Sequence, residues 1–386
     1  MGYVGWNDVS FHGSDQILTP NIDSLAYQSA ILQQYYSEAI CTPARTALLT
    51  GKYPMRLGMH GLPLFNSEDR GIPLTERLLP SYLKELGYAT HLWPNGRLMY
   101  GLDLYDDAIP QETEHRYIVD ALTDKAVKII HYHNSSQPLF LHVTHNGPHA
   151  GNAGGALQPP LYSLSRTTTS LTRTGDFILV KIVTQIDRSV GKIVEALGDK
   201  GILEDTIIVF VSDNGAATVG ELRNWGVNLP LRGKKYTPWE GAVRVPAFIW
   251  QASLRPKVWQ GLMHISDWLP TLITAAGGRV PAGIDGVNQW ESIMYDGVSK
   301  RKEVLITVED SATNAWASYR AGDYKIIVGN VTGVSNGYYG AELMVNKWSP
   351  PDYFPALGNS DVTRVLGEIG SPWLSIQCQT RPNRES

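Results

Sequence analysis

The run Thr206-Ile207-Ile208-Val209-Phe210-Val211, followed at once by Ser212-Asp213-Asn214-Gly215, decides the fold class of this chain. Its β-branched and aromatic residues are typical of a strand that is buried on both faces of a sheet. A helix is expected before it, because apolar residues recur at helical spacing from Ile178 to Leu197. Polar residues just beyond the carboxyl end of a parallel strand are where α/β folds usually place ligands.

The same order of helix and then strand occurs twice more, earlier in the chain. A helical pattern over 120–131 precedes an apolar run over 138–143, and a helical pattern over 78–86 precedes a run over 88–92. This alternation predicts an α/β fold with a large, mostly parallel sheet flanked by helices.

The character of the sequence changes near residue 303, where it becomes aromatic, glycine-rich and irregular. We expect a strand at Tyr324-Lys325-Ile326-Ile327-Val328. The chain is therefore predicted to have a main domain over 1–302 and a smaller, partial C-terminal subdomain over 303–386. The Gly-, Ser-, Thr- and Pro-rich stretch 151–174 is predicted to be a long loop, either functional or a simple surface connection.

The composition is that of an ordinary soluble globular protein. The chain has 386 residues, of which 43% are hydrophobic and 18% charged, with a net charge of −4. Acidic and basic residues are interspersed, so nothing favours nucleic acid or an anionic membrane as a partner. No apolar run is long enough to span a bilayer, and the chain as written opens without the features of a signal peptide.

Cysteine usage and glycosylation motifs say little about the compartment. The two cysteines, Cys41 and Cys378, are too few for a disulfide framework. Asn134-Ser135-Ser136 and Asn330-Val331-Thr332 are candidate glycosylation sites at Asn134 and Asn330. Such triplets arise often by chance, so they favour a secretory protein only weakly.

The most specific motif is Cys41-Thr42-Pro43-Ala44-Arg45, followed after four residues by Thr50-Gly51. A lone cysteine before a helix is often only a small buried hydrophobe. The five spaced positions Cys41, Pro43, Arg45, Thr50 and Gly51 are far more specific, and they match the motif in which the type I sulfatases have their cysteine oxidised to formylglycine. The chain is therefore identified as resembling that family, in particular its arylsulfatase B-like members, whose fold is alkaline-phosphatase-like.

The resemblance implies a catalytic role for Cys41 and Arg45. Formylglycine-generating enzyme would convert Cys41 to an aldehyde, whose hydrate attacks the sulfur of a sulfate ester beside calcium. Cys41 is thus expected to be both nucleophile and metal ligand. A helix N-terminus at this position favours an anion, and Arg45, one turn on, would hold the hydrated group. An ordinary surface arginine is the alternative.

The resemblance also assigns the calcium site. Val211-Ser212-Asp213-Asn214-Gly215 resembles the element in which Asp and Asn bind calcium, so Asp213 and Asn214 are expected as ligands. Carboxylate and amide oxygens suit a hard divalent cation. An Asp-Asn-Gly sequence after a strand can also be a common turn.

A lysine and a histidine are expected to contact the sulfate group. The segment 231–241 resembles the one that supplies the lysine, with Lys235 the better candidate and Lys234 the second. His149 in Gly147-Pro148-His149 matches the position of the sulfate-contacting histidine. His145 is the alternative if the loop is shifted, although a structural role at the end of its strand is the preferred interpretation for it.

Two elements of the family pattern are missing. Family members precede the Gly5-Trp6-Asn7-Asp8-Val9 stretch with a strand that ends in paired aspartates, where Gly2 and Tyr3 stand here. They also carry a Gly-Lys-Trp-His-Leu-Gly segment where this chain reads 93–101, and Arg97 would replace the lysine charge only in part. Loss of whole blocks is typical of a missing exon, a splice form or an incomplete gene model.

Two functions follow from these observations. The leading hypothesis is an arylsulfatase-type hydrolase of aryl or sugar sulfates that uses formylglycine and calcium and resides in the lysosome or is secreted. The alternative is a catalytically impaired or inactive sulfatase-like protein that at most binds sulfated ligands. An intact motif at Cys41 favours the former, and the missing aspartates favour the latter.

Overall fold

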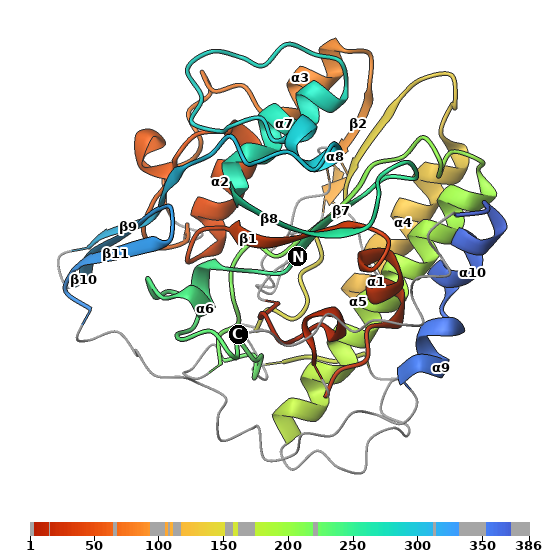
Figure 1. Cartoon of the computed structure of the whole chain (residues 1–386), viewed down its shortest axis with the longest axis horizontal. Helices are drawn as coiled ribbons and strands as arrows, with labels where there is room; N and C mark the ends of the chain where they lie inside the picture. Colours follow the sequence, from red (N-terminus) through yellow and green to blue (C-terminus); the bar gives the residue numbers. More distant parts are fainter. Residues whose placement is uncertain are drawn as a thin grey trace.

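The computed structural model describes residues 4–14, 16–64, 68–92, 105–106, 109–110, 117–150, 157–160, 174–218, 223–311, 314–331 and 353–371. Its main sheet has four strands in the order β6-β7-β1-β8, of which Figure 1 labels β1, β7 and β8. They are β1 (Ala30–Tyr36), β6 (Ile208–Val211), β7 (Ala247–Trp250) and β8 (Lys257–His264). β7 is antiparallel to both β1 and β6, and β1 is parallel to β8. Three of the four strands therefore run in one direction, and the predicted α/β fold class is confirmed.

Helices cover both faces of this sheet because neighbouring residues of a strand point to opposite sides. Ile31 packs in one buried cluster and Leu32 in another. The first cluster is closed by helices that lie together on one side of the sheet in Figure 1: α1 (Pro20–Ala26), α4 (Ile118–Tyr132), α5 (Thr174–Asp199) and α10 (Asp361–Glu368). The second is closed by α2 (Cys41–Thr50), α7 (Trp268–Ala275) and α8 (Trp290–Met294).

The predicted helix-and-strand pairs are present. The pattern over Ile178–Leu197 lies within α5, and its strand is β6. The other two pairs are α4 with β5 (Leu139–His142), and α3 (Leu79–Glu85) with β2 (Ala89–Leu92). β2 and β5 pair in parallel as a separate two-stranded sheet. The other described elements before residue 303 are β3 (Tyr105–Asp106), β4 (Ile109–Pro110), α6 (Glu240–Val243), η1 (Ser10–His12), η2 (Pro54–Leu57) and η4 (Ile265–Asp267).

The expected full burial of β6 is wrong. Only Phe210 is buried in this strand, and its other three residues are half-buried, whereas all four residues of β7 are buried. The physical reason is position: within the described part of the chain, β6 is at the end of the sheet and pairs on one side only. An apolar run indicates that a strand tends to be buried, but it does not show whether a neighbouring element is present to bury it.

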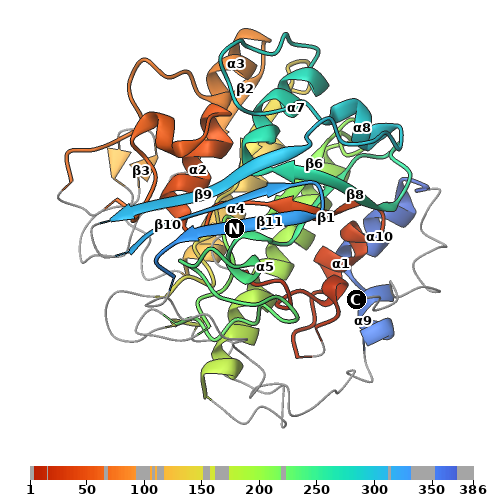
Figure 2. The same ribbon diagram turned by 60° about the vertical axis from the view of Figure 1, so that its left-hand side comes forward.

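The C-terminal region contributes an antiparallel sheet and two helices. The sheet has the order β11-β10-β9, formed by β9 (Glu303–Ser311), β10 (Asn314–Ala321) and β11 (Tyr324–Gly329) (Figure 2). It packs on the main domain through a cluster that includes Tyr36, Val243 and Trp316. In contrast, α9 (Tyr353–Gly358) and α10 pack against α1 and α5. We propose that the boundary between the main domain (1–302) and the C-terminal subdomain (303–386) lies at the start of β9.

Several sequence predictions lie wholly or largely outside the described residues. These are the substituted positions Gly2, Tyr3 and Arg97, the second cysteine Cys378, and most of the predicted loop 151–174.

Candidate active site

Cys41 is the first residue of α2 and follows the central strand β1 by five positions. Ile40 before it is extended, and its carbonyl accepts the first helical hydrogen bond, from the Ala44 amide at 3.2 Å. Pro43 is tolerated because it stands in the first turn, where its missing N–H costs no hydrogen bond. The Cys41 side chain is half-buried. The residue therefore stands at a helix N-terminus, where unpaired amides favour an anion.

Arg45 is directed at Asp213. Its Nε and Nη2 donate to Oδ2 of Asp213 at 3.1 Å and 3.0 Å. The arginine side chain is 32% exposed and the aspartate side chain 7%. This pair fixes the loop after β6 to the first turns of α2, so the two principal motifs of the sequence meet at one place.

Asn214 is fully buried, and its Oδ1 has no hydrogen-bond partner among the described residues. Its Nδ2 donates to the Gly215 carbonyl at 2.9 Å. Gly215 is required by space, because a Cβ there would lie 1.9 Å from the Gly241 oxygen. An unpaired amide oxygen at Asn214 and a carboxylate at Asp213 are both ligand types that a hard cation prefers.

The donor set is nevertheless too small for a complete calcium site. Within the described ranges, no group of three or more His, Cys, Asp or Glu side chains gathers where a metal ion could be held. Calcium normally takes six to eight oxygens, and Asp213 and Asn214 supply few of them. Only one of these two groups carries a charge that offsets the desolvation of the ion.

Lys235 lies between the two motifs. Its amide donates to the Ala216 carbonyl at 2.9 Å, and the next amide, that of Tyr236, donates to the Ala39 carbonyl at 2.9 Å. The Lys235 side chain is buried, which lowers its pKa well below the ordinary value. Lys234 is half-buried, and its backbone is engaged with the Thr237 hydroxyl. The backbone thus turns Lys235, rather than its neighbour, into the interior.

The two histidine candidates differ in their surroundings. His145 is buried, burial lowers its pKa to about 3, and its Nε2 lies 3.0 Å from the Ser189 Oγ. Ser189 in turn accepts from the Thr123 hydroxyl at 2.6 Å. His149 is half-buried in the loop after β5, with Nδ1 2.6 Å from the Ala150 carbonyl. His145 is therefore buried with Nε2 near Ser189, while its Nδ1 has no partner among the described residues, and its structural role stays a prediction.

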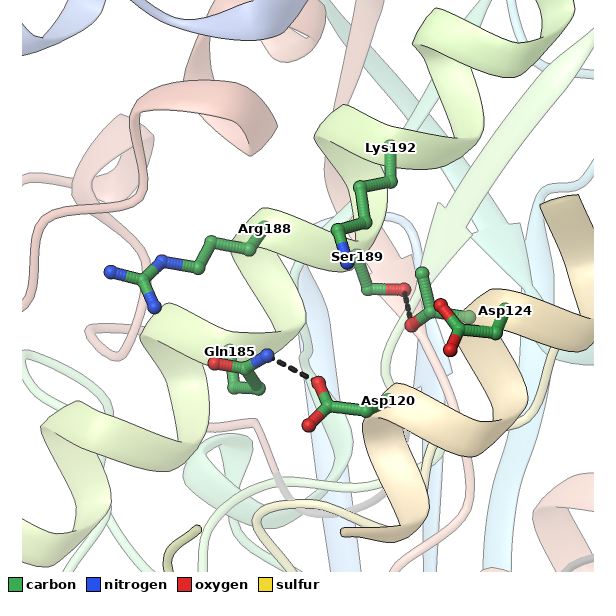
Figure 3. A pocket seen from close by; sticks show the side chains of 7 residues that line it. Asp120, Asp124, Gln185, Arg188, Ser189 and Lys192 are labelled. Carbon is green, nitrogen blue, oxygen red and sulfur yellow. Dashed lines mark hydrogen bonds between the residues drawn. The ribbon is translucent and has the colours of Figure 1, made fainter. Parts of the chain in front are cut away.

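Ser189 and Thr123 also line a cavity of about 390 Å³ between α4 and α5 (Figure 3). The other lining residues are polar or charged: Asp120, Asp124, Gln185, Arg188 and Lys192. Gln185 donates across it to Asp120, as Figure 3 shows. This cavity contains none of the residues that the sulfatase motifs assign.

The comparisons with known proteins identify the family. A family model described as "Sulfatase" matches residues 3–278 of the chain. The chain belongs to the sulfatase family. By family it is a sulfuric ester hydrolase, in agreement with the expectation from the motif at Cys41.

Curated relatives of this sulfatase have related activities in their names. Arylsulfatase J of Mus musculus is 29% identical over 436 residues, which cover 96% of this chain and 68% of that protein. N-acetylgalactosamine-6-sulfatase of Homo sapiens is 27% identical over 405 residues, covering 87% of this chain and 75% of that protein. The first alignment is longer than the 386 residues of the chain, so gaps stand in this sulfatase opposite segments of Arylsulfatase J.

Solved structures share the fold. The crystal structure of Ps i-CgsB in complex with k-i-k-neocarrahexaose has a TM-score of 0.75 at 22% identity, covering 98% of this chain and 92% of that one. The structure of BT4656 in complex with D-glucosamine-2-N,6-O-disulfate has a TM-score of 0.66 at 15% identity, covering 100% and 98%. At these identities the likeness shows the sulfatase fold alone.

Two residues of this sulfatase site were missed by the sequence analysis. The Ser37 hydroxyl donates to the Asp213 carbonyl at 2.5 Å. His142, the last residue of β5, has its pKa lowered to about 3 by burial, with a further contribution from the Arg45 charge. Ser37 stands one residue after β1 and His142 ends β5, so the rule that strand ends carry site residues could have indicated both.

The remaining candidate positions of the sulfatase lie on its surface. Asn134 and Asn330 are both exposed, and Asn134 Oδ1 accepts from the Ser136 amide at 3.1 Å and from its hydroxyl at 2.8 Å. A search of the described residues finds no helix with the length and apolar character needed to cross a membrane.

Proposed function

We propose that this sulfatase hydrolyses sulfate esters of aryl groups or sugars after formylglycine-generating enzyme has oxidised Cys41. The observation that carries the proposal is the position of Cys41 at the N-terminus of α2, one turn from the Arg45–Asp213 pair. The aldehyde of formylglycine supplies, as its hydrate, a hydroxyl nucleophile for sulfur and a second hydroxyl for release of sulfate. The relatives named for aryl and N-acetylgalactosamine sulfates support these substrate classes.

The chain's own residues would bind and orient the sulfate group. The N-terminus of α2, as the positive end of the helix dipole, favours its negative charge. Burial lowers the pKa of Lys235, and a bound sulfate would favour the protonated amine, which donates to a sulfate oxygen. His149 would contact the same group from the loop after β5. Arg45, one turn further along α2 and paired with Asp213, would help to orient the hydrated residue 41.

A divalent cation would be held by Asp213 and Asn214. Their support is the buried, unpartnered Oδ1 of Asn214 and the buried carboxylate of Asp213, which precedes it in the chain. Because two such residues supply few of the oxygens that calcium takes, we expect weak binding. No step of the reaction is assigned to the ion.

We also propose that the protein is lysosomal or secreted and carries N-linked glycans. The support is the exposure of Asn134 and Asn330, which an acceptor site requires. Digestion of secreted protein with a glycan-removing amidase, with Asn134→Gln and Asn330→Gln as controls, would shift the mobility of the wild type only.

The test of the main proposal combines mass spectrometry with turnover. In secreted protein, the peptide that contains residue 41 should show an aldehyde in place of the thiol, and a chromogenic aryl sulfate should be hydrolysed. Cys41→Ala should abolish turnover, because it removes the nucleophile. An unmodified thiol together with wild-type turnover no higher than that of Cys41→Ala would establish the alternative, an inactive sulfatase-like protein.

Matched lysine variants separate the two sulfate-binding candidates. Lys235→Ala should raise KM for a sulfated substrate by about tenfold or more, because a buried charge-assisted contact is lost. Lys234→Ala, half-buried and one residue away, should leave KM within about twofold. The reverse pattern would transfer the role to Lys234.

A further inference from the structure

Two backbone carbonyls of the short helix α6 hold segments that carry the sulfatase motifs. The Val243 carbonyl accepts from the Ser37 amide at 2.7 Å, in the segment that leads from β1 to Cys41. The Ala242 carbonyl accepts from the Gly215 amide at 2.8 Å, in the loop that carries the proposed cation ligands. α6 is therefore bonded both to the segment before the proposed nucleophile and to the loop after β6.

The start of α6 is bonded to the segment of the proposed sulfate-binding lysine. The Gly241 amide donates to the Arg232 carbonyl at 2.7 Å, shortly before Lys235 in the chain. The backbones approach closely there, because a Cβ at position 241 would overlap the Gly233 carbonyl oxygen. A displacement of α6 would therefore move the lysine segment, the nucleophile segment and the cation loop together.

The Glu240 carboxylate fastens α6 from two sides. Its Oε2 accepts from the Tyr36 hydroxyl at 2.7 Å, at the end of β1. Its Oε1 accepts from the Lys325 ammonium at 2.8 Å, on β11 of the C-terminal sheet. Burial opposes ionisation of Glu240, but the Lys325 charge and these hydrogen bonds hold its pKa below the ordinary value. Glu240 is therefore a carboxylate that joins α6 to both sheets.

Two arginines extend this contact into a connected polar network. Arg320 on β10 donates to the Tyr36 hydroxyl through Nη1 and to Gln34 Oε1 through Nη2 at 2.6 Å. Arg244, the residue after α6, has its Nη1 3.9 Å from Glu240 Oε2. The Tyr36 hydroxyl thus donates to Glu240 and accepts from Arg320, as a hydroxyl can do at once. Loss of one member of such a network affects the others as well.

We propose that Glu240 is a positioning residue that, through Tyr36 and Lys325, holds α6 and with it the three motif-bearing segments in the arrangement that catalysis needs. The inference rests on the proposed function at Cys41 and adds a residue to it. Because Glu240 acts through α6, it is not itself proposed to touch the substrate. The C-terminal sheet becomes part of the machinery that orients the active site, although β10 and β11 carry none of the sulfatase motifs.

Removal of either charge should change both kinetic constants. Glu240→Ala and Lys325→Met should each lower kcat about tenfold, because the nucleophile segment is no longer held in place. They should also raise KM about fivefold, because the lysine segment shifts with α6. Loss of stability alone reduces the amount of folded enzyme, and thereby the apparent kcat, but leaves KM unchanged. An unchanged KM in both variants would therefore overturn the proposal.

A milder variant and a matched control complete the series. Tyr36→Phe removes only the hydroxyl and should change kcat and KM in the same directions by about threefold. Glu291 and Lys300 form a surface ion pair at 3.0 Å, so Glu291→Ala is the control and should leave both constants within about twofold. Should Glu240→Ala fail to fold, Lys325→Met and Tyr36→Phe decide, and constants equal to those of the control would overturn the proposal.

A readout independent of turnover separates this proposal from the proposed function. In a Cys41→Ala background, hydrogen exchange of the Ser37 and Gly215 amides should speed up about tenfold with Lys325→Met and stay unchanged in the control, because both amides are bonded to α6. If the wild type hydrolyses no sulfate ester but this exchange pattern holds, the proposed function fails and the positioning by Glu240 stands. Unaltered exchange of both amides in Lys325→Met would overturn the positioning role whatever the activity.

Discussion

The guanidinium of Arg45 donates two hydrogen bonds to one carboxylate oxygen of Asp213, across 168 positions of sequence. This contact joins the helix that begins at Cys41 to the loop that follows β6. In a sulfatase it links the proposed nucleophile to the proposed cation ligand, so neither can move without the other.

The Arg45–Asp213 pair should show energetic coupling. Arg45→Ala and Asp213→Asn should each lower the free energy of unfolding by about 1–3 kcal/mol, because a charged group keeps its burial but loses its partner. A double-mutant cycle in urea should give a coupling of about 1–2 kcal/mol. The more exposed pair Arg56–Asp285 is the control, and its Arg56→Ala variant should change stability by less than about 1 kcal/mol. Additive effects of the two substitutions at 45 and 213 would contradict the prediction.

Calcium should bind weakly and through Asn214. With few oxygen donors, the dissociation constant should be about millimolar, so calcium raises Tm only at millimolar concentrations. Asn214→Ala should abolish the response. Asn228→Ala is the matched control, because the Asn228 amide is already occupied by Ala216 and Gly233, and it should lower Tm without changing the calcium response. Calorimetric binding in the micromolar range or tighter would show that further donors complete the site.

Glu38 should make stability fall as pH rises. Its pKa is raised from 4.5 to about 8 in the folded protein, so the folded state holds this proton more tightly than the unfolded state does. The stability from neutral Glu38 is complete below pH 4.5 and is lost as pH rises towards 8. The loss should be up to about 5 kcal/mol, from about 1.4 kcal/mol per pH unit. Urea unfolding of wild type and Glu38→Gln at a series of pH values should converge at low pH and diverge above it. Parallel curves would show that Glu38 is ionised throughout.

Arg301 should be among the most sensitive positions of the chain. It is 5% exposed and donates to both Asp267 oxygens, from Nε at 2.8 Å and from Nη2 at 2.5 Å. It also donates to the Tyr53 hydroxyl at 3.1 Å. Arg301→Ala leaves a buried carboxylate unpaired and should cost about 3–5 kcal/mol of unfolding free energy. The surface variant Lys300→Ala should cost less than about 1 kcal/mol. Equal effects of the two substitutions would mean that Asp267 finds another partner.

The elements and the motif that the sequence predicts correctly are those that depend on local interactions. The repeat of apolar residues between Ile178 and Leu197 predicts α5, because one face of a helix returns about every 3.6 residues. The β-branched run before Asp213 predicts β6, and a short run of residues with a specific spacing identifies the family at Cys41. Each of these inferences depends on residues within a single segment.

Structural features that depend on partners far away in the sequence could not be predicted. The half-burial of β6, the insertion of antiparallel β7 between β6 and β1, and the burial of Glu38 depend on which segments meet. Nothing in the run before Cys41 distinguishes an ionised surface glutamate from a buried neutral one.

By itself, therefore, the amino-acid sequence determined the family and the α/β class, and it indicated the position of the proposed nucleophile. Folding decided which of the neighbouring lysines 234 and 235 turns inward, which of the histidines 145 and 149 is buried, and which carboxyls have a pKa raised by burial. The reason is that periodicity and motifs record the preferences of adjacent residues, whereas burial and protonation depend on the dielectric and the partners that distant segments bring together.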